Sequence, residues 1–107
     1  MNLPKIITHL VAAQNNFDSV AYAKCFSETA VVFDEGRTHK GRKEIEIWIA
    51  DANKRYEAGM KPVSFEEKET GSILKAEASG NFPGSPILMS YHLKIADELI
   101  QSLKITG

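Results

Sequence analysis

The residues with the clearest potential for chemistry are Asp34 and the aromatic side chains that the fold could bring near it. Asp34 follows the apolar run AVVF at 30–33, and Trp48 lies on the apolar side of a predicted helix. A carboxylate at the end of an apolar strand, facing an aromatic ring, can lie in a dry pocket, where burial raises its pKa and makes it a usable base. The alternative is that Asp34 caps the turn DEG at 34–36 by accepting backbone N–H bonds, which would lower its pKa.

Trp48 has two possible roles. It can belong to the hydrophobic core, or it can form a platform for a ligand. In either case its indole N–H needs a hydrogen-bond partner, and Asp34 is a candidate. Tyr91, on a later predicted strand, can be a pocket phenol or a structural tyrosine.

The other reactive side chains, the histidines and the cysteine, do not predict a metal site or a nucleophile. His9, His39 and His92 have no paired ligand spacing, so no metal site is predicted. His39 is expected to be exposed in a polar loop, and His92 to lie on the surface or in an interface. Cys25 has no second cysteine for an intrachain disulfide and is predicted to be buried and inert. The absence of a phosphate loop, a nucleophile elbow and a nucleotide fingerprint predicts no cofactor.

The first half of the chain must position these groups with helices and one strand. Helical spacing over 3–13 predicts a first helix, and Asp18 is a good N-cap for a short second one. The β-branched segment 29–34 predicts a strand, followed by a turn and a polar link to Gly41. One apolar stripe over 42–58 predicts a long helix that Gly59 ends.

After Pro62 the hydrophobic period changes to two, which predicts a meander of three or four strands. Val63 and Phe65 are expected on one face. The middle strand carries small inward-facing residues, Ala76, Ala78 and Gly80, which leave room for a cavity unless the helix packs closer. Helices segregated on one sheet give an α+β architecture.

Composition excludes several classes of partner. With 13 basic and 14 acidic residues the net charge is −1, so nucleic acid is not an expected partner. No apolar run is long enough to span a bilayer, and the N-terminal segment lacks the features of a signal peptide. The chain is expected to be cytoplasmic and to form one domain over residues 1–107.

Three stretches in order carry a family pattern: CFSETAVVFDEG followed by HKGRKEIEIW, GNFPGSP leading into ILMSYHLKI, and DELIQSLKI. Together with the paired N-terminal helices, they resemble the SnoaL-like members of the nuclear transport factor 2-like superfamily. The resemblance implies a cone-like barrel, in which a curved mixed or antiparallel sheet wraps around N-terminal helices and one long helix. It also implies a homodimer through the open sheet face, with Ser90, His92 and Lys94 near the partner.

Within this superfamily, ketosteroid isomerases combine an aspartate base with a tyrosine and a neutral aspartic acid that donate to the oxyanion. The base follows a strand phenylalanine by eight residues, the spacing of Phe26 and Asp34, so the resemblance implies Asp34 as the base. Leu10 takes the place of the tyrosine donor and Tyr91 that of the aspartic acid. Losing an oxyanion donor costs about a hundredfold in rate, which argues against steroid isomerase activity.

The predicted site therefore has Asp34 and Tyr91 as catalytic residues and six ligand-binding side chains: Phe17, Tyr22, Phe26, Trp48, Phe82 and Met89. Three functions remain open. The protein binds a small hydrophobic molecule in the cone; or it is an isomerase, cyclase or dehydratase that uses Asp34 as general base on a carbonyl compound, without a cofactor; or it is a non-catalytic dimerisation module whose cone is filled by its own side chains.

Overall fold

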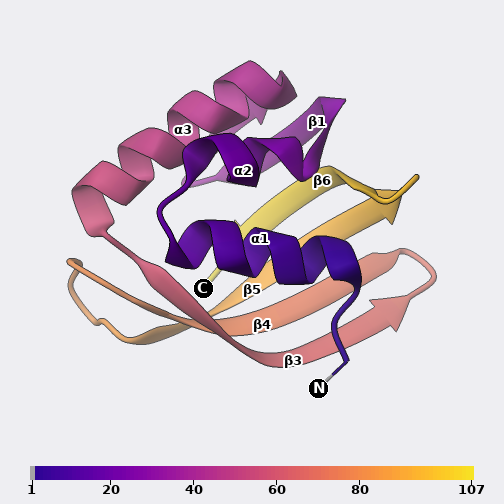
Figure 1. The fold of residues 1–107 in the computed structure, drawn as a ribbon. Coiled ribbons are helices and arrows are strands. Elements are labelled where there is room, and N and C mark those ends of the chain that lie inside the picture. Colours follow the sequence, from indigo (N-terminus) through magenta and orange to yellow (C-terminus); the bar gives the residue numbers. More distant parts are fainter. Residues whose placement is uncertain (1) are drawn as a thin grey trace.

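The computed structural model describes residues 2–107, which form three helices and six strands (Figure 1). The order along the chain is α1 (Lys5–Asn15), α2 (Ser19–Lys24), β1 (Phe26–Asp34), β2 (Arg37–Lys40), α3 (Gly41–Tyr56), β3 (Gly59–Lys68), β4 (Gly71–Ser79), β5 (Ile87–Ala96) and β6 (Leu99–Thr106). The predicted α+β architecture, with helices and one strand before a meander, is confirmed.

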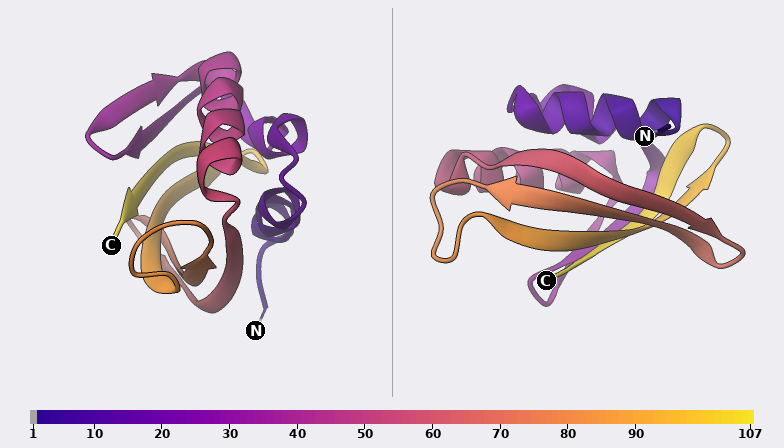
Figure 2. Two further views of the ribbon diagram at one scale, coloured as in Figure 1. Left: turned by 90° about the vertical axis from the view of Figure 1, so that its left-hand side faces the viewer. Right: turned by 90° about the horizontal axis from the view of Figure 1, so that it is seen from below.

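The six strands form one mixed sheet in the order β2-β1-β6-β5-β4-β3. β1 runs parallel to β6, and the other neighbours are antiparallel. The helices cover one face of the curved sheet (Figure 2). The cone-like shape is as expected. The predicted barrel is wrong, because the sheet does not close and β2 and β3 remain open edges.

The strand β2 was not predicted, since 37–40 reads only as a polar link. It pairs with β1 so that Asp34 faces Arg37 and Phe33 faces Thr38. The connecting residues Glu35 and Gly36 both have positive φ, 50° and 73°, which suits the tight turn of a hairpin. An exposed edge strand buries neither face strongly, so its sequence shows no apolar alternation.

The helix boundaries follow local chemistry. Asp18 caps α2 as predicted, because its carboxylate accepts the N–H of Ala21 at 3.0 Å. The predicted stop of the long helix at Gly59 is wrong. Glu57 adopts the left-handed conformation, with φ 46°, and closes α3 earlier, whereas Gly59 already begins β3.

The inner face of the sheet carries the core. Leu74 and Ala76 are fully buried, in agreement with the period-two pattern of β4. Val63 does not share the inner face with Phe65, because the pairing of β3 with β4 shifts between Pro62 and Ser64. This bulge leaves Val63 52% exposed.

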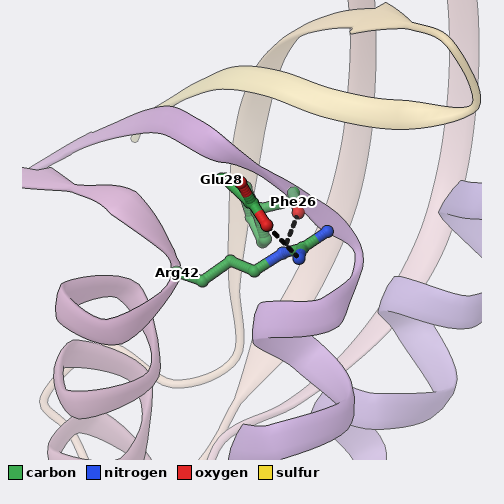
Figure 3. A network of polar contacts seen from close by, with 3 residues as sticks. All are labelled: Phe26, Glu28 and Arg42. Atoms are coloured by element: carbon green, nitrogen blue, oxygen red, sulfur yellow. Dashed lines mark hydrogen bonds and ion pairs between the residues drawn. The ribbon is translucent and has the colours of Figure 1, made fainter.

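Arg42 joins the start of α3 to the start of β1. Its Nε donates to the carbonyl oxygen of Phe26 at 2.7 Å, and its guanidinium lies 3.8 Å from the carboxylate of Glu28 (Figure 3). The pairing of β1 with β6 is irregular just after Phe26, so Arg42 supplies a partner where the strand ladder is interrupted. Gly41, with φ 82°, makes the sharp turn from β2 into α3. Together these contacts fix α3 against β1.

Candidate functional site

A cavity of about 390 Å³ lies between α3 and the inner face of the sheet. Much of its wall is apolar: Ile49, Ala52, Met60, Ala78, Met89 and Ile105. The small side chains of Ala52 on α3 and Ala78 on β4 leave this space open. The inward-facing alanine predicted to make room therefore does so at Ala78, whereas Ala76 packs in the core.

Gly80 lies just after β4, where the chain passes close to the end of α3. A Cβ atom there would come within 2.4 Å of the carbonyl oxygen of Tyr56. Only glycine permits this approach, and it brings Phe82 edge-on to the ring of Tyr56, with centroids 6.2 Å apart. Both rings line the cavity on this side.

Asp34 reaches the cavity from the end of β1 and is half-buried. Burial raises the pKa of its carboxyl, and the neighbouring charge of Glu35 raises it further. Hydrogen bonding from the Trp48 side chain, the nearby His39 and the backbone of Glu35 lower the pKa, but they do not cancel the rise. The alternative in which a turn cap lowers this pKa is therefore wrong in direction.

Two phenols lie in the same cavity as Asp34. Tyr91 on β5 is 8% exposed, and burial together with the charge of Asp34 raises its pKa to about 12. Burial raises the pKa of Tyr22 on α2 well above its ordinary value, with smaller effects from Tyr91 and Asp34. Both phenols thus stay protonated at neutral pH. Within residues 2–107 neither hydroxyl has a hydrogen-bond partner, so both can donate to a ligand.

Tyr22 places a second phenol in the cavity beside Tyr91. Leu10, which takes the place of the tyrosine donor on the first helix, is fully buried in the core. Tyr22 sits one helix later, where it was predicted only as a ligand-binding wall residue. Its burial, 2% exposed, and its place beside Trp48, with ring centroids 6.1 Å apart, direct it into the site. Spacing within α2 alone could not show this.

Six of the eight predicted site residues line the cavity: Asp34, Tyr91, Tyr22, Trp48, Phe82 and Met89. Phe17 does not, because it lies in the connection between α1 and α2 with φ 52° and is 47% exposed. Phe26 does not either, because it is fully buried in the core, against Tyr22.

His39 is not the exposed loop residue that was predicted. Its ring stacks on Trp48 with centroids 5.4 Å apart, and its Nε2 is buried without a hydrogen-bond partner. A second groove, between α3 and the β1–β2 hairpin, includes His39 and shares Asp34 and Trp48 with the cavity. Asp34 thus lies at the boundary between the cavity and this groove.

The charged side chains of the cavity wall are acidic. Its ionisable carboxylates are Asp34 and Glu35, and no Lys, Arg or His is among its lining residues in the described part of the chain. At the far side from β1 it also contains two neutral amides, Gln14 and Asn53. This wall disfavours anions and suits neutral or cationic molecules.

The remaining reactive groups lie elsewhere. Cys25 is buried, and burial raises its thiol pKa, which makes it a poorer nucleophile. His92 is half-buried on β5, 3.1 Å from the hydroxyl of Thr106. Across residues 2–107 there is no cluster of three or more His, Cys, Asp or Glu side chains placed to hold a metal ion. In the same range, no helix has the length and apolarity needed to cross a membrane.

Several solved structures share this fold. A scan of protein-family models and a search of curated protein sequences gave no match. Among solved structures, a proposed polyketide cyclase from Sinorhizobium meliloti is 33% identical, with a TM-score of 0.91 over 97% of this chain and 95% of that one. A protein with a ketosteroid isomerase-like fold from Catenulispora acidiphila, solved in complex with trimethylamine, is 21% identical, with a TM-score of 0.87 over 99% and 87% of the two chains.

An epoxide hydrolase/cyclase-like enzyme of pyran-ring formation in the polyether salinomycin shares the fold at 13% identity, with a TM-score of 0.76 over 94% of this chain and 86% of that one. The identity and near-complete coverage of the Sinorhizobium protein extend the likeness beyond the fold alone. The chain therefore belongs to the SnoaL-like members of the nuclear transport factor 2-like superfamily.

Proposed function

We propose that the cavity binds a small, mostly apolar carbonyl compound and that Asp34 moves a proton at the carbon next to the carbonyl. One observation carries the proposal: a carboxylate with a raised pKa and two protonated phenols without internal partners share one cavity. Such a pairing of a base with oxyanion donors is what enolisation requires.

In the proposed step, the Asp34 carboxylate takes a proton from the α-carbon, and the electron pair of the C–H bond moves toward the carbonyl oxygen. Tyr22 and Tyr91 donate hydrogen bonds to the enolate oxygen that forms. Asp34 then returns the proton to the same or a conjugated carbon, so no cofactor is consumed. The raised pKa of Asp34 brings the base closer to the weak carbon acid, which favours the transfer.

Benzylacetone, a neutral arylalkyl ketone, tests this proposal. Its α-protons exchange with solvent deuterium, and NMR measures the rate. Asp34→Asn should lower the protein-catalysed rate by about 10²–10⁴-fold, because it removes the base. Tyr91→Phe and Tyr22→Phe should each lower it less. An exchange rate that Asp34→Asn leaves unchanged would reject Asp34 as the base.

A second function, binding of a small ammonium ion without chemistry, is supported by a different observation. The wall combines two carboxylates with the rings of Tyr22, Trp48 and Tyr56 and has no basic side chain in the part described. Aromatic rings beside carboxylates attract alkylammonium ions, and the Catenulispora neighbour was solved with trimethylamine. Titration with trimethylamine, using Trp48 fluorescence, separates the two: tight amine binding without ketone exchange favours the second function.

The third function, a module with a filled cone, has less support, because the cavity remains open between α3 and β4.

A further inference from the structure

We propose that Gln14 and Asn53 form a second recognition point in the cavity. It takes a neutral group that both donates and accepts a hydrogen bond, such as a hydroxyl or a carboxamide, on the part of the ligand remote from its carbonyl. The inference deepens the proposed function, on which it rests for the position of the carbonyl.

The orientation of both amides follows from their partners. Gln14 lies 2.7 Å from the carbonyl oxygen of Ala58, which can only accept, so the Gln14 nitrogen must point there. The same nitrogen lies 3.1 Å from the Asn53 side chain, which must therefore present its oxygen. Gln14 Oε1 and Asn53 Nδ2 are left over. One is an acceptor and the other a donor.

Neither leftover atom has a hydrogen-bond partner in the part of the chain that the structure describes. Among residues 2–107, no hydrogen bond engages Gln14 Oε1 or Asn53 Nδ2, and neither atom is a fully buried group without a partner. Gln14 is nevertheless only 9% exposed. Both residues line the cavity, and a mostly buried amide with a free hydrogen-bonding atom is suited to a ligand or an ordered water.

Further hydrogen bonds fix the backbone next to Gln14 and Asn53. Next to Gln14, Asn15 exchanges two hydrogen bonds with the backbone of Met60, at 3.0 and 2.8 Å. The wall from Ala58 to Met60 is thus fixed to the end of α1 by two adjacent amide side chains. A fixed donor and acceptor lose little entropy when a ligand binds.

Asn53 and Trp48 lie at different heights along α3. Asn53 follows Trp48 by five residues, which is about 7.5 Å along a helix, and Trp48 lines the cavity together with Asp34. The wall between them is apolar, formed by Ile49 and Ala52 on α3 and by the facing strands. The expected ligand is therefore uncharged, with an apolar middle between its two polar groups.

Two related ketones test the recognition point in the intact protein. Benzylacetone has a carbonyl and a plain phenyl ring, and its para-hydroxy derivative adds a hydroxyl at the remote end. Calorimetry should show the hydroxy ketone binding about tenfold more tightly to the unmodified protein, because it gains the amide contacts. Equal affinities, or no binding of either ketone, would overturn the inference.

Variants of Asn53 test whether the tighter binding of the hydroxy ketone depends on this residue. Asn53→Leu keeps the side-chain volume but removes the free donor, and should bring the ratio of the two dissociation constants to within about two- to threefold. Asn53→Ala gives the same comparison if the leucine variant does not fold. Asn16→Leu, a matched change on an exposed asparagine outside the cavity, should keep the tenfold ratio. A preference that survives both Asn53 variants contradicts the recognition point.

The two proposals fail separately. If α-proton exchange does not depend on Asp34 while the hydroxyl preference depends on Asn53, the base is wrong and the recognition point is right. If exchange depends on Asp34 but the two ketones bind equally, the reverse holds.

Discussion

The inner face of the sheet has a filled end and an open end, although β4, β5 and β6 run through both. At the filled end, Leu74, Leu93 and Leu103 are almost completely buried against the helices. At the open end, the same strands present Ala78, Met89 and Ile105 to the cavity. The backbone pattern is the same at both ends. Met89 and Ile105 are as large as the leucines, so the open end differs by its small side chains, Ala78 on β4 and Ala52 on α3, which leave space between sheet and helix.

The largest expected effect is at the filled end. Phe26→Ala should lower the free energy of unfolding by about 3–5 kcal/mol, because it empties a fully buried site among close-packed neighbours. Chemical denaturation measures this. Phe82→Ala, at the cavity, serves as the matched control and should cost clearly less, since Phe82 is partly exposed. Equal costs would break the distinction between the two ends.

Two alanines on β4 test the distinction more sharply. Ala76→Leu should destabilise the protein by about 1–3 kcal/mol, because its position is fully buried with no space for a larger side chain. Ala78→Leu should cost less, because its side chain enters the cavity, and it should block the binding of benzylacetone. Calorimetry and denaturation of both variants check this. If Ala78→Leu still binds the ketone, the ligand does not occupy this cavity.

The pH dependence of stability tests the raised pKa of Asp34, which lines the cavity. The folded pKa of Asp34 lies above its unfolded value, so between these two values the folded state holds more protons than the unfolded state. Stability therefore falls as pH rises through that window, and Asp34→Asn avoids the loss. Thermal unfolding from about pH 4 to about pH 8 should show Asp34→Asn gaining on the unmodified protein as pH increases. A gain that is largest at low pH contradicts the raised pKa.

The smallest effect is expected at Phe17, outside both ends. Phe17→Ala should change the free energy of unfolding by about 0.5 kcal/mol or less, because the ring is half exposed. The affinity for benzylacetone should stay unchanged, since Phe17 does not line the cavity. A measurable loss of affinity in titration would return Phe17 to the site.

Strongly periodic segments were predictable. The apolar stripe of α3 and the inward positions of β4 and β5 follow from spacing alone, and so does Asp34 at the end of an apolar strand. Segments without a buried face were not. The strand β2 is polar because it is an exposed edge, and the bulge at Val63 reverses an alternation that the sequence shows as continuous.

The candidate site residues were likewise predictable only where they belong to a strongly periodic element. Trp48 and Tyr91 belong to periodic elements, so their inward direction was expected and their place in the cavity agrees with it. Phe17 and Phe26 are aromatic residues near the same helices, yet one is exposed and the other is core. Tyr22 as a donor and His39 stacked on Trp48 depend on contacts between elements that spacing within one element does not describe.

The sequence by itself determined the order of the elements other than β2, the inward faces of the strongly periodic ones and the position of one carboxylate at a strand end, because these follow from local periodicity and turn chemistry. Only the tertiary structure decided which inward side chains meet a neighbour and which face empty space. That choice depends on the volumes of residues far apart in the chain, such as Ala52 and Ala78, and on partners such as Gln14 and Asn53. The cavity, its two phenols and its amide pair all result from such long-range contacts.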